Sequence, residues 1–201
     1  MENSPLAQVP TPSYVIDLEK LKQNLQTLRY VADQSGCRIL LAQKAFSAYD
    51  TYALIGEYLD GTAASGIYEA RLGAEYMPHG EVHVFSPAYR DEEFVEVLGL
   101  ANTIVFNSFS QWLRFKPLLE QHIADERPPV SVGLRINPLY SEVEVDIYNP
   151  AAPGSRLGVT LDAFNQGMLA HGLEGLEGIH FHALCEDSAE TLERTLEHVY
   201  R

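Results

Sequence analysis

The sequence contains few cysteines, few basic residues and no long apolar run. Its two cysteines, Cys37 and Cys185, are too few for a disulfide framework, so we expect free thiols and a cytoplasmic protein. Lys and Arg number 14 against 28 Asp and Glu, and the resulting charge of −14 disfavours nucleic acid as a partner. No apolar run approaches the ~20 residues of a spanning helix, and no export signal is visible. We therefore expect no membrane partner.

Composition and length are those of a folded domain. Hydrophobic residues make up 46% of the 201 residues, and charged residues make up 21%. These values are far from the low hydrophobicity and high charge of disordered chains, and the length suits one domain or a little more.

Helical and strand-like patterns alternate along the chain. An apolar stripe at spacings of three and four follows the candidate N-cap Asp17 and predicts a helix that ends near Gly36. The apolar run 37–42 then predicts a buried strand. Further helices are expected at 52–59, 68–76, 91–100 and 161–170, and further strands at 62–65, 82–85, 103–106, 130–136 and 176–181. This alternation predicts an α/β fold with a parallel sheet.

Two segments depart from the simple alternation. Ser108 and Gln111 have the spacing of a capping box and open a helix that Pro117 is expected to kink or shorten. Residues 137–158 hold three prolines, two glycines and several acids without any period, which predicts a long loop. Long loops in compact domains are often functional.

The last helix is expected to begin at Asp187, with Glu190 three residues later. Its apolar stripe consists of Leu192, Leu196 and Val199. The sequence stops at Arg201, inside this stripe, and only six or seven strands are predicted where a closed β/α barrel has eight. We therefore expect residues 1–201 to form one barrel domain that is incomplete at its C-terminus.

Lys44 directly follows a predicted apolar strand, so its amine would lie at the carboxyl end of the sheet, where α/β proteins bind ligands. A partly desolvated lysine there can form a Schiff base with a carbonyl compound. The alternative is an exposed lysine at a strand end.

His180 and His182 stand two apart on a predicted strand and so point to one face. With Cys185 nearby they could be read as a zinc site, but a third ligand at proper spacing is not evident, and we expect no metal. The alternatives are that a histidine stacks on a planar cofactor or forms hydrogen bonds within the core.

Three further features could contact a ligand. Arg135 ends an apolar strand, where a cation needs an anion or acceptor, and a structural ion pair would serve as well as a ligand. Ser65 precedes a helix, a place suited to a phosphate, although Ser-Gly is also a common turn. The acidic run 141–146 is a solvated surface by default, or a contact for a polyamine.

Taken together, these segments resemble the pyridoxal-phosphate decarboxylases and racemases built on an alanine-racemase-type barrel, and within them the carboxynorspermidine/carboxyspermidine decarboxylase family. The resemblance runs through most of the chain. The stretches that carry it are Thr11-Pro-Ser-Tyr-Val15, Gln43-Lys-Ala-Phe-Ser47, Ala64-Ser-Gly-Ile-Tyr-Glu-Ala-Arg-Leu-Gly73, Phe85-Ser-Pro-Ala-Tyr89, Ile104-Val-Phe-Asn-Ser-Phe-Ser110, Pro153-Gly-Ser-Arg-Leu-Gly158, His180-Phe-His182 and Leu184-Cys-Glu186.

The resemblance implies a partial (β/α)8 barrel and pyridoxal 5'-phosphate as the cofactor. Lys44 would bind the cofactor as a Schiff base, His182 would stack on its ring, and Arg135 would lie near the ring hydroxyl or a partner group. The other positions to which the resemblance points are Ser65 and Glu69 at the barrel mouth and Arg156 in a secondary pocket.

The implied reaction is loss of carbon dioxide from carboxynorspermidine or carboxyspermidine in polyamine biosynthesis, by a homodimer. The family's glycine-rich phosphate loop, the acidic partner of its pyridine nitrogen and its C-terminal β-domain are absent from residues 1–201. We therefore expect the chain alone to bind the cofactor poorly and to lack turnover. Three other functions stay open: a diaminopimelate or other basic amino-acid decarboxylase, a non-enzymatic pyridoxal-phosphate carrier, and an inactive regulator.

Overall fold

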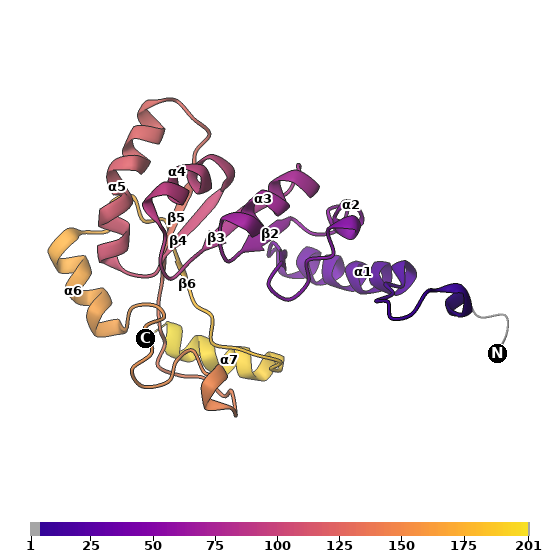
Figure 1. The fold of residues 1–201 in the computed structure, drawn as a ribbon. Coiled ribbons are helices and arrows are strands. Elements are labelled where there is room, and N and C mark those ends of the chain that lie inside the picture. The colour runs from indigo at the N-terminus through magenta and orange to yellow at the C-terminus, as the bar shows by residue number, and fades with distance from the viewer. Residues whose placement is uncertain (1–4, 201) are drawn as a thin grey trace.

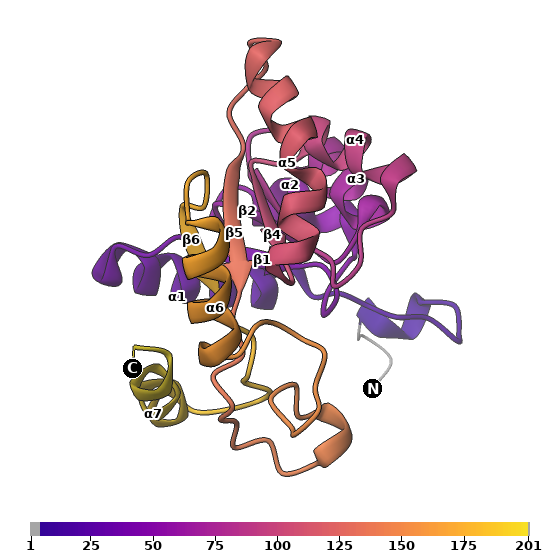
Figure 2. The ribbon, with the colours of Figure 1, turned by 90° about the vertical axis from the view of Figure 1, so that its left-hand side faces the viewer.

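The computed structural model describes residues 5–200, which build one parallel sheet with helices between its strands. Six strands pair in chain order, each parallel to the next. They are β1 (Leu40–Ala42), β2 (Gly61–Ala64), β3 (Glu81–Phe85), β4 (Thr103–Phe106), β5 (Ser131–Arg135) and β6 (Gly178–His180). The sheet curls into part of a barrel (Figures 1 and 2). The predicted partial (β/α)8 barrel is confirmed.

The helices connect successive strands, as parallel pairing requires. They are α1 (Leu18–Ser35), α2 (Tyr52–Ile55), α3 (Ile67–Tyr76), α4 (Asp91–Leu100), α5 (Phe109–Ala124), α6 (Leu161–His171) and α7 (Ala189–Val199). Short 3₁₀ turns lie at Pro5–Gln8, Tyr49–Thr51 and Asp146–Tyr148. No helix within residues 5–200 is long and apolar enough to cross a membrane.

Local capping sets several helix boundaries. Asp17 accepts a hydrogen bond from the Lys20 amide at the start of α1, and Gly36 closes the helix in the left-handed conformation, both as predicted. The Ser108 hydroxyl likewise accepts from the Gln111 amide at the start of α5. The bounds of α4 and β4 are those predicted from the sequence.

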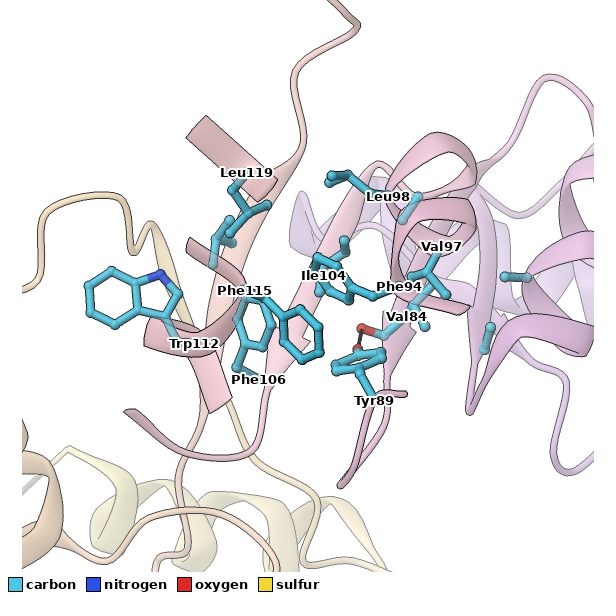
Figure 3. Packing of buried hydrophobic residues seen from close by; sticks show 14 of the residues in the cluster. Val84, Tyr89, Phe94, Val97, Leu98, Ile104, Phe106, Trp112, Phe115 and Leu119 are labelled. Atoms are coloured by element: carbon cyan, nitrogen blue, oxygen red, sulfur yellow. Dashed lines mark hydrogen bonds between the residues drawn. The ribbon is translucent and has the colours of Figure 1, made fainter. Parts of the chain in front are cut away.

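The main core lies between the sheet and the helices that follow β2, β3 and β4. Val84 and Phe106 point from their strands to this side, where Phe94 and Phe115 stack with ring centroids 4.0 Å apart (Figure 3). Trp112 extends the same cluster along α5. Because side chains alternate along a strand, residues one position away face the other side, which is the barrel interior.

Pro117 does not end or shorten the helix around it, since α5 runs for 16 residues through it. Proline removes one backbone hydrogen bond from a helix interior. Trp112 and Phe115 before Pro117, and Leu119 after it, are all buried against the sheet. This packing holds both halves of the helix in line.

Other boundaries differ from the prediction. β1 begins three residues later than expected, at Leu40, and Cys37 is exposed. The helix expected over 52–59 is a single turn, α2, followed by hydrogen-bonded turns.

The predicted start and buried face of the last helix are wrong. Ser188 caps α7, because the Asp187 carboxylate accepts from the Cys185 amide instead. Thr191 and Thr195 are the buried residues of α7, whereas Leu192 is 41% exposed. The apolar stripe is therefore only partly covered by residues 5–200.

Candidate functional site

A group of basic side chains gathers at the carboxyl ends of the strands, on the interior side of the sheet. Lys44 lies two residues beyond β1, in a turn where the Ala45 and Phe46 amides donate to the Ala42 carbonyl. The preceding residue, Gln43, is buried on the other side, where its Oε1 accepts from the Tyr52 hydroxyl at 3.1 Å. Lys44 itself is exposed, so the described residues do not supply the partial desolvation expected of it.

Arg135 is the buried member of the group. It ends β5, is 4% exposed, and donates through one terminal nitrogen to the His182 carbonyl at 3.3 Å. Its Nε is buried without a partner, and within residues 5–200 no carboxylate lies at ion-pairing distance from it. Burial lowers the pKa of Arg135. Its guanidinium carbon lies over the ring of Phe85, 4.6 Å from the centroid.

His180 pairs with Arg135 across β5 and β6, and its ring stacks on Phe85 with centroids 5.4 Å apart. Its Nδ1 is buried without a hydrogen-bond partner. Burial, Arg135 and His182 lower its pKa to about 4, so the imidazole is neutral at pH 7.

His182 lies just beyond β6, with its ring 6.5 Å from that of His180. Its pKa is lowered by partial burial and by the charges of Arg135 and Lys44. The charges of Arg135 and Lys44 thus both act on His182, and the binding roles of these three residues stay a prediction.

Ser65 and Glu69 lie at the end of β2 and the start of α3. Ser65 is exposed, and its backbone amide donates to the Glu69 carboxylate at 2.6 Å. Glu69 therefore satisfies the backbone where the strand turns into the helix. Its charge also contributes, after burial, to the raised pKa of Tyr52.

Arg156 is exposed on the long loop, and the structure gives its side chain no contact with Arg135 or His182. Its backbone is fixed instead. Asn107 donates to the Arg156 carbonyl at 2.9 Å and accepts from the Gly158 amide at 2.8 Å. Gly158 has φ +81°, and a Cβ there would lie 2.8 Å from the carbonyl carbon of Ile136. Only glycine lets the loop pass this close to the end of β5.

The acidic run in the same loop is engaged by α7. Arg194 binds both Glu142 oxygens at 2.6 Å, and Tyr140 donates to the same carboxylate. Hydrogen bonds from these two side chains lower the pKa of Glu142 to about 2. Figures 1 and 2 both show the loop beside α7, away from α3 and α4. Glu142 is therefore held by α7 and is not free to bind a polyamine.

Two residues that support the site were not predicted from the sequence. Tyr89 is buried, and its hydroxyl shares its proton between the Val84 carbonyl (Figure 3) and the Val105 carbonyl and accepts from the Ser86 amide. Phe85, the first residue of the motif Phe85-Ser-Pro-Ala-Tyr89, contacts both Arg135 and His180. Strand alternation over 81–85 could have predicted that Phe85 faces the barrel interior, but it could not have predicted which residues Phe85 contacts.

Across residues 5–200, no group of three or more His, Cys, Asp or Glu side chains is arranged to hold a metal ion. In particular, the His180–His182 pair does not form such a group with the exposed Cys185.

Comparison with known proteins shows that the chain is similar to part of several decarboxylases. No family model matches it. The chain is 38% identical over 189 residues to carboxynorspermidine/carboxyspermidine decarboxylase of Campylobacter jejuni, covering 94% of this chain and 46% of the relative. It is 39% identical over 197 residues to carboxyaminopropylagmatine decarboxylase of Synechocystis, covering 98% and 48%. The chain thus spans about half the length of the curated relatives it matches.

The chain is also similar to solved structures of decarboxylases. The chain superposes on carboxynorspermidine decarboxylase of Campylobacter jejuni, solved with norspermidine, with a TM-score of 0.80 and 36% identity, covering 94% of this chain and 46% of that one. Diaminopimelate decarboxylase of Helicobacter pylori, solved with L-lysine, has a TM-score of 0.78 but only 18% identity, covering 96% and 50%, and so shares the fold. The resemblance to carboxynorspermidine/carboxyspermidine decarboxylases is confirmed over nearly the whole chain.

Proposed function

We propose that this chain supplies the cofactor-binding barrel face of a pyridoxal-phosphate-dependent decarboxylase that acts on carboxynorspermidine or carboxyspermidine. The observation that carries the proposal is Arg135, a buried guanidinium that has no carboxylate partner among residues 5–200 and an unpartnered Nε. An unpaired buried charge is costly, and an anionic ligand would remove that cost. His182 lies near enough to both Arg135 and Lys44 for their charges to lower its pKa.

The residues present fit pyridoxal phosphate, which carries negative charge and an aldehyde. Lys44 supplies the amine that can bind the aldehyde, and its exposure leaves that amine accessible. His182 would lie against the ring, and Arg135 would bind an anionic or hydroxyl group of the cofactor. Ser65 would complete the cofactor contacts at the end of β2.

When bound, the cofactor supplies an electron sink for the pair of electrons that carbon dioxide leaves behind. Arg135 holds positive charge at a fixed place in a water-poor interior, where electrostatic stabilisation is strong. His180, neutral at pH 7, adds no competing charge beside Arg135. The side chains thus bind and orient, and Lys44 is the group able to exchange a proton at its Nζ.

The substrate class is supported by charge and by the relatives. A net charge of −14 attracts ammonium-rich molecules. The match to carboxyaminopropylagmatine decarboxylase, over 98% of the chain, favours a guanidine-bearing carboxylate as a second candidate substrate. We keep Glu69, beside the end of β2, and Arg156, on the long loop, as candidates for substrate contacts. A homodimer and a cytoplasmic location, the latter consistent with two exposed free cysteines, complete the proposal.

Carbon dioxide release from a substrate panel tests this function. The panel holds carboxynorspermidine, carboxyspermidine, carboxyaminopropylagmatine and diaminopimelate, assayed with pyridoxal phosphate on the chain alone and on a chain extended past Arg201 to the length of its relatives. We expect the extended chain to decarboxylate one of the first three, and Lys44→Ala to abolish release. Turnover of diaminopimelate alone would overturn the assigned substrate class. Release that persists in Lys44→Ala would overturn the role of Lys44.

A further inference from the structure

Arg135 needs something to hold it in place, because the usual partner is missing. A buried arginine is normally fixed by a carboxylate, which binds its planar fork at two points. Here one terminal nitrogen donates to the His182 carbonyl, and Nε has no partner. One carbonyl at 3.3 Å does not fix the orientation of the guanidinium plane. A second contact is required.

Phe85 provides that contact from the third strand. Its ring lies under the guanidinium, with 4.6 Å between the guanidinium carbon and the ring centroid, within the range of a cation–π interaction. The same ring stacks on His180 at 5.4 Å with 27° between the planes. One aromatic side chain therefore touches both partly desolvated basic groups of β5 and β6.

The residues between Phe85 and Arg135 on β4 and β5 leave space for these two side chains to meet across the sheet. Phe85 pairs in register with Val105 on β4, and Val105 pairs with Gly133 on β5. A Cβ on Gly133 would already lie 3.4 Å from Val105. The small residue at this position keeps the interior open between Phe85 and Arg135.

We propose that Phe85 is a positioning residue of this site: its ring holds the Arg135 guanidinium in place of a carboxylate, so that Nε stays free to bind an anionic or hydroxyl group of the ligand. A carboxylate would neutralise Arg135 and compete with that ligand. An aromatic ring fixes the cation without cancelling its charge. The identity of the ligand as pyridoxal phosphate rests on the proposed function.

The contact itself is tested without any cofactor. Protons that lie over an aromatic face resonate upfield, so the side-chain protons of Arg135 are followed by NMR and assigned through their loss in Arg135→Lys. We expect upfield signals in the native chain and in Phe85→Tyr, and their return to ordinary positions in Phe85→Leu. Ordinary positions in the native chain would overturn the proposal.

The consequence is tested with pyridoxal phosphate as the probe. Borohydride trapping at increasing concentration gives the half-saturation of Lys44 labelling. Because a cation–π contact contributes about 0.5–2 kcal/mol, Phe85→Leu should raise half-saturation roughly two- to thirtyfold, and Phe85→Tyr should stay closer to native than Phe85→Leu. Phe164→Leu is the matched control, since Phe164 is a partly buried aromatic on the outer side of the sheet.

Failure of the role proposed for Phe85 and failure of the proposed function give different results. Native labelling with equal half-saturation in Phe85→Leu would overturn the role of Phe85 and leave the proposed function intact. No labelling of Lys44 in the native chain or in its extended form would overturn the proposed function, and the ring-current measurement then decides alone whether Phe85 holds Arg135.

Discussion

At the scale of single residues, the site is built from groups whose polar atoms face inward without internal partners. Arg135 Nε and His180 Nδ1 are both buried and unpartnered, on neighbouring strands at paired register positions. Such atoms are uncommon in folded proteins, because each unsatisfied buried group costs about 1–3 kcal/mol. Two more such atoms, Gln43 Nε2 and Thr62 Oγ1, lie beside α3 on the other side of the sheet, and the pair on the interior face supports the proposed ligand site.

Tyr89 shows the opposite arrangement, with every bond satisfied. Its hydroxyl joins the carbonyls of Val84 and Val105 at the carboxyl ends of β3 and β4 and accepts from the Ser86 amide, and burial raises its pKa. Tyr89→Phe removes the hydroxyl and with it these hydrogen bonds. We expect a loss of about 1–3 kcal/mol in the free energy of unfolding, measured by urea denaturation.

The control for that measurement is Tyr30→Phe, since Tyr30 is 64% exposed on α1. It should change stability by less than about 0.5 kcal/mol. Equal stability of Tyr89→Phe and the native chain would contradict the role given to the Tyr89 hydroxyl.

The positions of site residues were predictable where the sequence pattern shows the end of a strand. Lys44, Arg135 and His182 each follow an apolar run, and the structure places them at one edge of the sheet. The contacts of Phe85 with Arg135 and His180, and of Tyr89 with Val105, were not predictable. These contacts join segments 16 to 95 positions apart, which depends on the curl of the sheet rather than on local pattern.

At the scale of secondary-structure elements, the packing of α6 on α5 depends on a glycine where the two helices meet. Gly167 faces α5 from α6, and a Cβ there would lie 2.3 Å from the ring of Phe109. Gly167→Ala therefore forces the ring or the helix to move. We expect a loss of about 1–3 kcal/mol in unfolding free energy, measured by urea denaturation.

Gly99 in α4 is the matched control, because nothing lies within 4 Å of the Cβ position there. Gly99→Ala should stabilise the protein by about 0.5–1 kcal/mol, since alanine loses less backbone freedom in a helix. If the two substitutions had the same effect, the close contact between α5 and α6 would be refuted.

The long loop contacts α7 through the Glu142 carboxylate and through the Tyr140 ring, which stacks on His198. The Glu142 pKa is depressed to about 2 by Arg194 and Tyr140, so this contribution to stability is complete above the ordinary carboxyl pKa of about 4.5 and is lost as pH falls from there towards 2. Arg194→Met should return the Glu142 pKa towards its ordinary value. NMR titration of the Glu142 carboxyl carbon measures it directly.

Hydrogen exchange follows the loop in the same variant, and we expect faster exchange of the amides near 141–143 at pH 7. Arg114→Met is the control, because Arg114 pairs with Asp91 between α5 and α4, away from the loop. An unchanged Glu142 titration in Arg194→Met would show that the loop is held by other contacts.

Elements were predictable where capping residues and apolar spacing agree. For α4, a run of acids opens the helix and Phe94, Val97 and Leu98 bury one face, and its bounds were predicted correctly. For α7, the predicted start was one residue too early. Ser188 caps the helix, and the Asp187 carboxylate instead accepts from the Cys185 amide. Pro117 lies within α5, because Trp112 and Phe115 before it and Leu119 after it are buried against the sheet.

At the scale of the whole molecule, six parallel strands in chain order bring residues from positions 44 to 182 to one end of a curled sheet. Ligands of parallel α/β proteins bind at this end. The fold class followed from the alternation of helices and strands, whereas the curl that gathers the side chains did not. The negative net charge adds a long-range attraction for cationic substrates, which salt would weaken.

Mapping of pyridoxal phosphate onto the four lysines of this chain tests the central claim most directly. Lys20 and Lys22 lie on α1 and Lys116 on α5, so they serve as internal controls. After borohydride reduction and peptide mass analysis, we predict one dominant pyridoxyl group, on Lys44, that is lost in Lys44→Ala and weakened in Arg135→Met. Labelling spread evenly over the lysines, or confined to the helices, in both the chain and its form extended past Arg201 would contradict the account.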